Sequence, residues 1–474
     1  MNASSYGAVM GRRSEILRKA TGIDYEAFER GGLAFDYEGM MTSVGYDIPA
    51  AISIQRETGV GRTPLLELRR MTALARAVAP KGMGARIFVK DEAANPSGSF
   101  KDRRAALAVY EAAKRGYKGV VAATSGNYGA AVASQAAARG LRCIVVQEVF
   151  DSRGVGQPEI VEKGRKCEAY GAEVLQVSVG PELFYLLLAV LEDTSYFSAS
   201  LYTPYAIAGI ATLGHEIGLE AKQRFGREPD AVVVTHAGGG NLTGTAVGLR
   251  TAGCTGTRVV AASVDLRGLH MASDHDFNRK SFTTGHTGFG VPFVTNPDRV
   301  DVPRNAARPL RYMHRYLLVT QGEAFYMTEL LARLEGLERG PAGNTSLAAA
   351  FALAQEMSED KILIVQETEY TGAGKHPNAQ LAFAREQGIQ VSRGDPSTER
   401  PGTSIVIPDH ASRLRPRDLE LDDLRRSYLR QIGERGGVRH LSADEMAYLS
   451  AETRWPEDRV RREWDALAAV SPTT

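Results

Sequence analysis

The hydrophobic pattern changes character near Gly61, where short apolar runs begin to alternate with longer amphipathic stretches. Runs rich in β-branched residues predict buried strands, and stretches in which apolar residues recur every three or four positions predict helices. Strands separated by helices of this length predict largely parallel sheets covered on both faces, so an α/β protein is expected. The predicted strands lie within residues 85–92, 119–126, 142–148, 230–240, 257–265 and 361–367, and two of the predicted helices cover 103–116 and 127–140.

The same pattern divides the chain into segments. The sequence pattern changes near Leu201–Pro204, which predicts a boundary between two lobes. Near the C-terminus, Ser442 precedes acidic residues and is expected to begin a helix. The mixed charge of that region predicts a solvated helix face, with a partner-binding helix as the alternative. The expected segments are a helical N-terminal arm (1–60), the start of the core packing with the large lobe (61–84), a smaller lobe (85–203), a larger lobe (204–412) and a charged helical segment (413–474).

Composition excludes several classes of protein. Lys and Arg total 57 against 56 Asp and Glu, which favours neither a nucleic acid nor a membrane surface as partner. Three scattered cysteines exclude a disulfide framework and a paired-cysteine zinc site, and no His, Cys and carboxylate cluster suggests a metal. The most apolar short run, 184–191, is too short to span a bilayer, and the N-terminus does not resemble a signal peptide. We therefore expect a cytoplasmic protein.

Two glycine-rich turns follow predicted strands and carry the first indication of chemistry. The turn at 124–130 opens a helix, so its backbone amides can bind an anion such as a substrate carboxylate. The turn at 236–244 contains three consecutive glycines, which let the backbone approach a phosphate closely. A nucleotide is the competing ligand, but no dinucleotide fingerprint occurs, and Glu369 and His376 break the phosphate-loop pattern at 371–376.

A third turn, 95–99, delivers Lys101 to the start of a predicted helix. From its position alone this lysine is an exposed helix residue, a phosphate counter-charge or a Schiff-base amine. A phosphate-binding turn and a lysine without nucleotide motifs together point to pyridoxal phosphate, whose aldehyde combines with a lysine amine and whose phosphate needs a nest of amides.

Four motifs now carry a resemblance to a known family. The segments "NPSGSFKDR", "TSGNYG", "GAEV" and "GGGNLTG", in this order, resemble the fold-type II pyridoxal-phosphate enzymes, the superfamily of tryptophan synthase β and threonine synthase. The resemblance covers roughly Gly61 to Gly374. It implies two lobes, each with a largely parallel sheet flanked by helices, and a cofactor held between them.

The resemblance also implies roles for individual residues. Lys101 would form the Schiff base, and Asn127 would hydrogen-bond the ring hydroxyl of the cofactor. For the ring nitrogen we favour Thr368, with Glu367 and Glu369 as alternatives; a neutral hydroxyl would leave that nitrogen unprotonated, whereas a carboxylate would keep it protonated. The amides expected to hold the phosphate belong to Ala237, Gly238, Gly239, Gly240 and Asn241, and the residues expected to receive the substrate carboxylate are Thr124, Ser125, Gly126 and Asn127.

Segments outside these motifs resemble a narrower group. Residues 23–41, 284–304 and 366–389 resemble the β subunits of 2-amino-4-ketopentanoate thiolases, enzymes of ornithine degradation, and this resemblance extends to about Ile432. It implies an acyltransferase that cleaves 2-amino-4-oxopentanoate with coenzyme A to acetyl-CoA and alanine, with Lys101 as the base for the α-proton. It also implies a small α subunit and a homodimer of this chain.

Two other functions remain open at this stage. One is an elimination or replacement on an amino acid, as in threonine synthase or an ammonia-lyase, and the other is a non-catalytic scaffolding subunit, which an intact Lys101 disfavours. Cys143 and Cys167 are expected in element interiors, and Cys254 in a more reachable loop, with a structural role favoured over acyl transfer for each. For His236 a supporting hydrogen bond is favoured over acid–base work.

Overall fold

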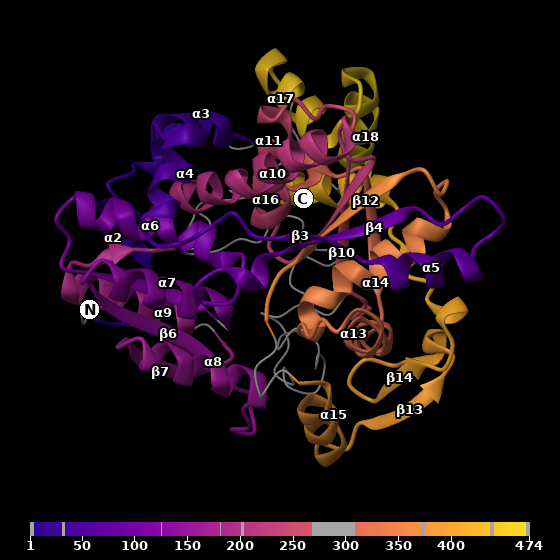
Figure 1. Cartoon of the computed structure of the whole chain (residues 1–474). Coiled ribbons are helices and arrows are strands. Elements are labelled where there is room, and N and C mark those ends of the chain that lie inside the picture. Colours follow the sequence, from indigo (N-terminus) through magenta and orange to yellow (C-terminus); the bar gives the residue numbers. More distant parts are fainter. Residues whose placement is uncertain are drawn as a thin grey trace.

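The computed structural model describes residues 4–30, 34–124, 126–180, 182–200, 203–267, 309–370, 376–436 and 440–470. Two lobes lie side by side, each built around its own sheet (Figure 1). The smaller sheet has the strand order β7-β6-β5-β8 and is parallel throughout. Its strands are β5 (Gly119–Thr124), β6 (Arg142–Phe150), β7 (Glu173–Ser178) and β8 (Phe197–Ser198).

The larger sheet has seven strands in the order β15-β11-β10-β9-β12-β4-β3. Its five inner strands run parallel, and β3 and β15 close the two edges antiparallel. In all five inner strands nearly every residue is buried, as expected for parallel strands covered on both faces. The strands are β3 (Leu65–Glu67), β4 (Arg86–Asp91), β9 (Ala231–Thr235), β10 (Arg258–Val264), β11 (Arg315–Val319), β12 (Ile362–Glu367) and β15 (Arg417–Asp418).

Helices cover both sheets. The smaller sheet and the N-terminal arm share one apolar cluster, whereas the larger sheet has a separate cluster on each of its faces. The helices of the arm and smaller lobe are α1 (Tyr6–Gly11), α2 (Arg13–Thr21), α3 (Tyr37–Ser43), α4 (Ile48–Arg56), α6 (Lys101–Lys114), α7 (Asn127–Ala138), α8 (Pro158–Ala169) and α9 (Glu182–Thr194). Those of the larger lobe are α5 (Arg69–Val78), α10 (Pro204–Phe225), α11 (Gly240–Thr251), α13 (Gln321–Glu335), α14 (Pro341–Gln355) and α15 (Pro377–Glu386).

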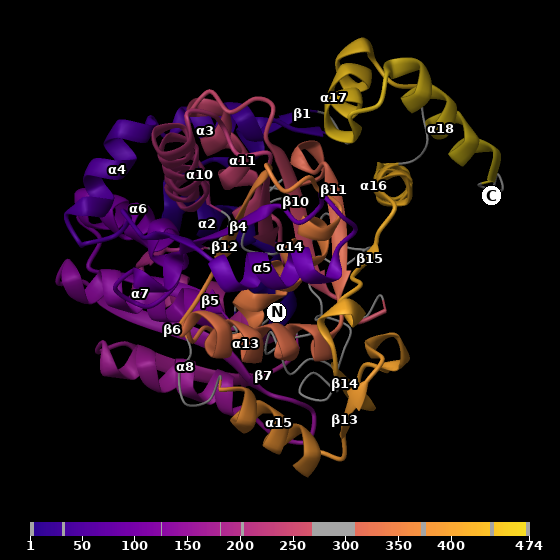
Figure 2. The same ribbon diagram turned by 45° about the vertical axis from the view of Figure 1, so that its right-hand side comes forward.

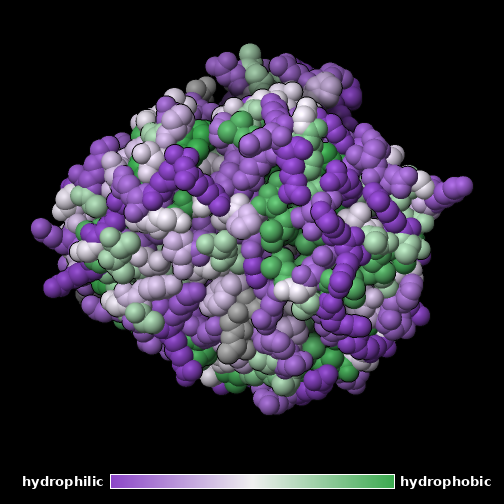
Figure 3. Space-filling view, viewed as in Figure 1, coloured by the Kyte–Doolittle hydropathy of each residue, from purple (hydrophilic) through white to green (hydrophobic). Residues whose placement is uncertain are grey.

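Short elements complete the chain. A parallel pair, β13 (Gln390–Gly394) and β14 (Ser404–Pro408), follows α15, and an antiparallel pair, β1 (Glu29–Arg30) and β2 (Ala34–Phe35), lies in the N-terminal arm. The 3-10 turns are Tyr25–Phe28, Glu92–Ala94, Pro309–Tyr312, Pro396–Thr398 and Ala411–Arg413. In the view of Figure 3 most of the surface is hydrophilic, and hydrophobic side chains gather in a strip near its middle.

The charged C-terminal segment forms α16 (Leu421–Gly436), α17 (Ala443–Thr453) and α18 (Glu457–Val470). Ser442 starts α17 with a capping box, as predicted: its side chain accepts from Glu445 N, and the Glu445 side chain accepts from Ser442 N. One face of this segment is buried, because Trp455 and Trp464 join an apolar cluster of the larger sheet. Helices α17 and α18 stand out from the rest of the molecule at the edge of the larger lobe (Figure 2).

The predicted strands and helices are all present, with one difference in their grouping. The strand predicted at 85–92 falls in the segment assigned to the smaller lobe, yet β4 pairs with β12 in the larger sheet. The chain therefore enters the smaller lobe only after β4, through the turn that carries Lys101. Among the described residues, no helix combines the length and apolar character needed to cross a membrane.

Candidate cofactor and substrate site

Lys101 lies where the two lobes meet, because its turn is paired to the end of a strand of the larger sheet. Phe100 N donates to Thr368 O at 3.1 Å, and Tyr370 N donates to Gly98 O at 3.0 Å, just beyond the last residue of β12. Lys101 is the first residue of α6, and its Nζ lies 4.4 Å from the centre of the Phe100 ring. The half-buried lysine is therefore held at the carboxyl edge of the large sheet.

The residue after the lysine fixes this turn from the other side. Asp102 is fully buried, and its Oδ2 accepts from Ser97 N at 2.6 Å, so the carboxylate ties the start of the turn to the first turn of α6. A carboxylate at a helix N-terminus also interacts favourably with the positive end of the helix dipole. Burial nevertheless raises the pKa of Asp102 to about 7, because water cannot reach its charge.

The predicted phosphate turn lies between the end of β9 and the start of α11. Gly239 has φ +89°, a conformation that favours glycine, and α11 begins at the next residue, so successive amides face the loop. The buried Thr235 Oγ1 and Asn241 Oδ1 have no hydrogen-bond partner among the described residues. The Thr235 hydroxyl and the amides at the helix N-terminus can donate to a phosphate, whereas the Asn241 side-chain oxygen only accepts and would need a different donor.

Arg104, a residue given no role by the sequence patterns above, lies against this phosphate turn. It is 3% exposed and follows Lys101 by three residues on α6. A Cβ built on Gly240 would lie 2.3 Å from Arg104 Nη2, so the guanidinium fills the space beside the first residue of α11. A buried cation at the positive end of a helix is unfavourable unless an anion lies between them. The phosphate turn together with Arg104 therefore fits a phosphorylated cofactor.

The helices that carry these groups touch backbone to backbone. A Cβ built on Gly209 of α10 would lie only 2.0 Å from Arg103 O of α6, so a larger residue there would separate the two helices. Helix α10 also packs extensively on α11, which begins at the phosphate turn. Helix α10 thereby sets the position of the lysine helix relative to the phosphate turn.

The predicted carboxylate turn lies at the end of β5, in the smaller lobe. Gly126 N donates to Thr124 Oγ1 at 2.9 Å, and α7 begins at Asn127, so its first amides are available for an anion. Ser125, the other residue predicted there, lies outside the described residues. A second cation that the sequence patterns did not indicate is close by: a Cβ built on Gly126 would lie 2.9 Å from Lys163 Nζ.

Lys163 comes from α8, far from these motifs in the sequence. Its side chain is buried and forms an ion pair with Glu159, and this carboxylate together with Glu369 raises the pKa of Lys163 despite the cost of burial. The ammonium therefore stays charged beside the turn predicted to receive a substrate carboxylate. Gln380 Nε2 of α15 donates to Glu159 Oε2 at 3.1 Å, which links the two lobes here.

The three residues considered for the ring nitrogen lie in different surroundings. Glu369 accepts a hydrogen bond from Asn127 Nδ2, across the space between the lobes. Glu367 lies against α14, where a Cβ built on Gly343 would touch its Oε1, and burial raises its pKa well above the usual range. Thr368 is buried between them, and its carbonyl accepts from the lysine turn.

The prediction that Cys254 is reachable is wrong. It is 3% exposed, because Gly218 of α10 and Ala252 let the helices close over it, and burial raises its pKa. Cys143 and Cys167 are buried as expected, and burial raises the pKa of both thiols to about 12. A thiol that stays protonated is a poor nucleophile, which favours the structural role for all three.

His236 is also buried, with its ring edge-on to Tyr316 at 5.2 Å between centres. Its backbone N donates to Ala262 O at 2.7 Å, which continues the β9–β10 pairing up to the phosphate turn. In the part of the chain that the structure describes, no group of three or more His, Cys, Asp or Glu residues is arranged to hold a metal ion.

Comparison with known proteins agrees with this geometry. The family described as "Pyridoxal-phosphate dependent enzyme" matches residues 56–367, and the chain belongs to that family. It is 61% identical over 457 residues to a 2-amino-4-ketopentanoate thiolase beta subunit from an unknown prokaryotic organism, covering 96% of this chain and 97% of the relative. It is 62% identical over 450 residues to the subunit of the same name from Acetoanaerobium sticklandii, covering 95% and 96%.

A solved structure shares the fold. A threonine deaminase from the organism abbreviated T.th. superposes with a TM-score of 0.53 at 26% identity, covering 69% of this chain and 97% of that chain. The prediction of an α/β pyridoxal-phosphate enzyme of fold type II is therefore confirmed, as is the resemblance to the thiolase β subunits.

Proposed function

We propose that this chain is the cofactor-bearing subunit of a 2-amino-4-ketopentanoate thiolase, which cleaves 2-amino-4-oxopentanoate with coenzyme A to acetyl-CoA and alanine. The observation that carries the proposal is the 61–62% identity to two such subunits over nearly the whole chain. Identity of this extent includes the regions outside the pyridoxal-phosphate core, where enzymes of one fold acquire different activities.

Pyridoxal phosphate, when bound, forms a Schiff base with an amine and stabilises negative charge on the carbons next to it. Lys101 supplies the amine, and Asn127 bonds the ring hydroxyl. We add Arg104 to the amides of the phosphate turn, because its buried guanidinium lies beside Gly240. The turn amides are those of Ala237, Gly238, Gly239, Gly240 and Asn241.

Thr368 is the proposed partner of the ring nitrogen. Glu367 and Glu369 are the alternatives, and their side chains lie against α14 and Asn127 respectively. Thr368→Val should shift the visible absorbance maximum of the holoenzyme if the hydroxyl bonds the ring nitrogen, whereas Glu367→Gln should leave it unchanged. The reverse pattern would assign the carboxylate.

The substrate carboxylate is received by Thr124, Ser125, Gly126 and Asn127, with Lys163 as a counter-charge beside them. Lys101 Nζ is the proposed base that removes the α-proton of the substrate, because it is the amine held at the centre of the site. Substrate deuterated at the α-carbon should therefore lose its label to water during turnover. Retention of the label in alanine would contradict this role.

The function requires partners. The printed name "beta subunit" of the two relatives supports a partner α subunit for this chain, and we propose a second copy of the chain as a further partner. The proposed substrates are coenzyme A and a 2-amino-4-oxo acid, in the cytoplasm.

Two measurements test the proposal. Borohydride reduction followed by peptide mapping should place the label on Lys101, and an unmodified Lys101 would contradict the cofactor assignment. Acetyl-CoA and alanine should form from 2-amino-4-oxopentanoate and coenzyme A when the chain is combined with its α subunit. Release of ammonia or phosphate from a substituted amino acid, with no acyl-CoA under any condition, would support the elimination or replacement reaction instead.

A further inference from the structure

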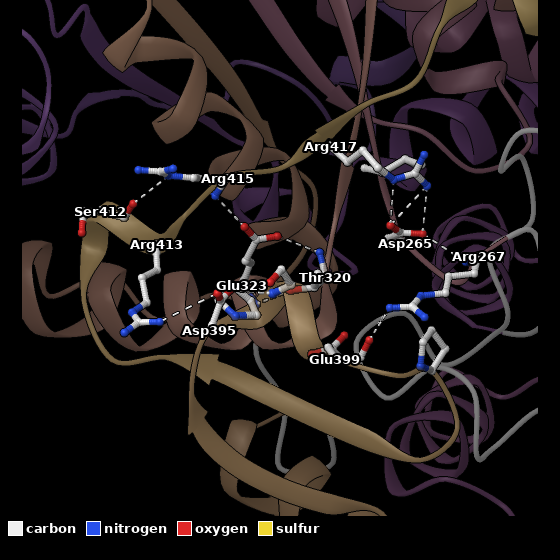
Figure 4. A pocket seen from close by; sticks show the side chains of 14 residues that line it. Asp265, Arg267, Thr320, Glu323, Asp395, Glu399, Ser412, Arg413, Arg415 and Arg417 are labelled. Atoms are coloured by element: carbon white, nitrogen blue, oxygen red, sulfur yellow. Dashed lines mark hydrogen bonds and ion pairs between the residues drawn. The ribbon is translucent and has the colours of Figure 1, made fainter.

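A cleft opens at the edge of the larger sheet that also carries the phosphate turn. Strand β10 ends at Val264 and β11 at Val319, and the cleft is lined by residues that follow them, including Asp265, Arg267 and Thr320 (Figure 4). Strand β10 pairs directly with β9, whose end carries the phosphate turn. Because these strands are parallel and about 4.8 Å apart, the carboxyl ends of β10 and β11 lie one and two strand spacings from the end of β9. The volume of the cleft is about 820 Å³.

Four arginines line the cleft and make it rich in positive charge: Arg267, Arg413, Arg415 and Arg417. All four are exposed and come from the ends of β10 and the segment after β14, so they surround one opening (Figure 4). Arg415 forms no ion pair among the described residues, and its Nε makes a 3.3 Å bond to Ser412 O. The contacts between Arg417 and Asp265 are long, at 3.3–3.4 Å.

The carboxylates deeper in the cleft are already used by the fold. Glu399 accepts from the backbone amides of Gln321, Gly322 and Val406 at 2.8–3.0 Å. Glu323 accepts from Thr320 N and from Arg415 N at 2.7–2.8 Å, and both glutamates are at most 3% exposed. Buried carboxylates that are bonded to amides do not reach the exposed guanidinium groups.

Other charges at the opening leave part of the arginine set available. Arg413 pairs with the exposed Asp409 at 2.8 Å and lies 4.0 Å from Asp395, contacts that water and salt weaken. The apolar residues that line the cleft are the buried Leu318 and Pro396 and the half-buried Pro401. The cleft thus presents several exposed guanidinium groups, the side chains best suited to bind phosphate groups.

We propose that this cleft binds the 3′-phospho-ADP end of coenzyme A, which carries phosphates on both sides of its ribose. The inference rests on the proposed function, which requires coenzyme A. The position next to the cofactor site accounts for the reaction: the nucleotide is held by the arginines while the long pantetheine arm carries the thiol to the neighbouring strand ends. Arg415 and Arg417 are the principal phosphate contacts.

The test uses the complete complex with its α subunit and compares three thiols: coenzyme A, dephospho-coenzyme A and pantetheine. The variant Arg415→Gln/Arg417→Gln should raise the KM for coenzyme A by about tenfold or more, because each charge-assisted contact to phosphate is lost. Its effect on dephospho-coenzyme A should be smaller. Cleavage with pantetheine, which has no phosphate, should proceed at the wild-type rate, and this also shows that the variant is folded.

The matched control is Arg393→Gln, an exposed arginine of β13 that pairs with Glu329 outside the cleft. It should leave all three thiols unaffected. Equal kinetics of the double variant and wild type with coenzyme A would overturn the inference while leaving the thiolase function intact. If the wild-type complex cleaves no substrate with any thiol, the proposed function itself fails.

Discussion

Arg103 and Arg104 are consecutive residues of α6, yet their side chains lie in different electrostatic surroundings. We call the network around Arg103 (Lys90, Glu92, Glu216 and Glu220) the back region, and Arg104 and Lys163 with the helix N-termini beside them the front region. Arg103 points to the back of the helix, into a set of buried groups that neutralise one another. Arg104 points to the front, toward the phosphate turn at the N-terminus of α11. The comparison separates a cation that lies within a network of buried carboxylates from a cation that lies beside the N-terminus of a helix.

The back region is a closed network. Arg103 donates to both carboxylate oxygens of Glu92 at 2.7 and 2.8 Å and to Glu216 at 2.9 Å. Glu216 also accepts from the buried Lys90 at 2.6 Å, and a second carboxylate, Glu220, accepts from Lys90 at 2.7 Å. These cations lower the pKa of Glu216 to about 2, so the carboxylate stays ionised although it is largely buried. Such a network holds β4, α6 and α10 together behind the lysine.

The front region has a different arrangement. Arg104 and Lys163 are both buried, and each lies beside the first residues of a helix, where the dipole favours an anion. Two cations at two helix N-termini match a cofactor phosphate and a substrate carboxylate. The difference teaches that burial alone does not distinguish structural charges from binding charges, whereas the position of a cation relative to a helix dipole does.

The largest effect should follow from removing the reactive group of the front region. Lys101→Ala should lower turnover more than about a thousandfold, because the proposed Schiff-base amine and base are lost together. Urea unfolding of the cofactor-free protein should be almost unchanged, since Lys101 takes no part in the back network. Thiolase turnover and the denaturation midpoint are the two measurements, and near-normal turnover would contradict the role of Lys101.

Breaking the back region should affect stability instead. Arg103→Met leaves the fully buried Glu92 without a cation and Glu216 with Lys90 alone, which should cost about 3–5 kcal/mol of unfolding free energy. Chemical denaturation measures this loss. The control is Arg86→Met on β4, the strand that also carries Lys90 of the network. The pair between Arg86 and Glu67 is partly exposed and should contribute about 1 kcal/mol or less. Equal losses of unfolding free energy in the two variants would show that the buried network stabilises the fold no more than a partly exposed ion pair does.

Arg104→Gln should act on the cofactor. We expect the Kd for pyridoxal phosphate to rise by about 10–100-fold, because one charge-assisted contact to the phosphate is removed. Stability without cofactor should be maintained, since a cation no longer faces the positive end of α11. Pyridoxal without phosphate is the control ligand, and its affinity should be the same for variant and wild type. A parallel loss of affinity for both ligands would place Arg104 among the structural charges.

Much of this comparison could be predicted from sequence, and part of it could not. Each of the three turns follows a strand and contains glycines in a pattern typical of an anion-binding turn. The local sequence is therefore enough to predict that Lys101, Gly126 and Gly239 belong to a binding site. Lys163 has no such signal, because only the packing of α8 brings it beside β5. Arg104 does have a weak signal, one turn after Lys101 on the same helix face.

The other two differences between the predictions and the structure, at Cys254 and at β4, also arise from contacts between residues that are distant in the sequence. Cys254 follows a turn, which predicts exposure, but it is covered by α10 through contacts distant in sequence. Strand β4 lies between residues 85 and 203, yet its partner β12 comes more than 250 residues later. Local pattern predicts the elements, whereas their neighbours depend on which apolar faces meet.

A smaller effect is expected from the second cation of the front region. Lys163→Gln should raise the KM for the amino acid substrate by about tenfold and leave the cofactor affinity unchanged, because Lys163 lies beside Gly126 and not beside the phosphate turn. The comparison with Arg104→Gln is direct, since each variant should impair one anion site. Steady-state kinetics and cofactor titration measure the two effects. A change in cofactor affinity alone would reverse the assignment.

The smallest effect concerns Asp102, which lies between the two regions. Its pKa is about 7 in the folded protein against 3.8 for an unperturbed carboxyl, so unfolding between these values releases a proton. Stability should therefore fall as the pH rises from about 4 to about 7 and level off above it. Asp102→Asn removes this contribution, and its advantage over wild type should grow by at least about 1 kcal/mol by pH 7. Urea unfolding at several pH values measures the difference, in which the similar contributions of Glu323 and Glu399 cancel. An advantage that does not change with pH would mean that Asp102 is ionised throughout and belongs with the neutralised charges behind the helix.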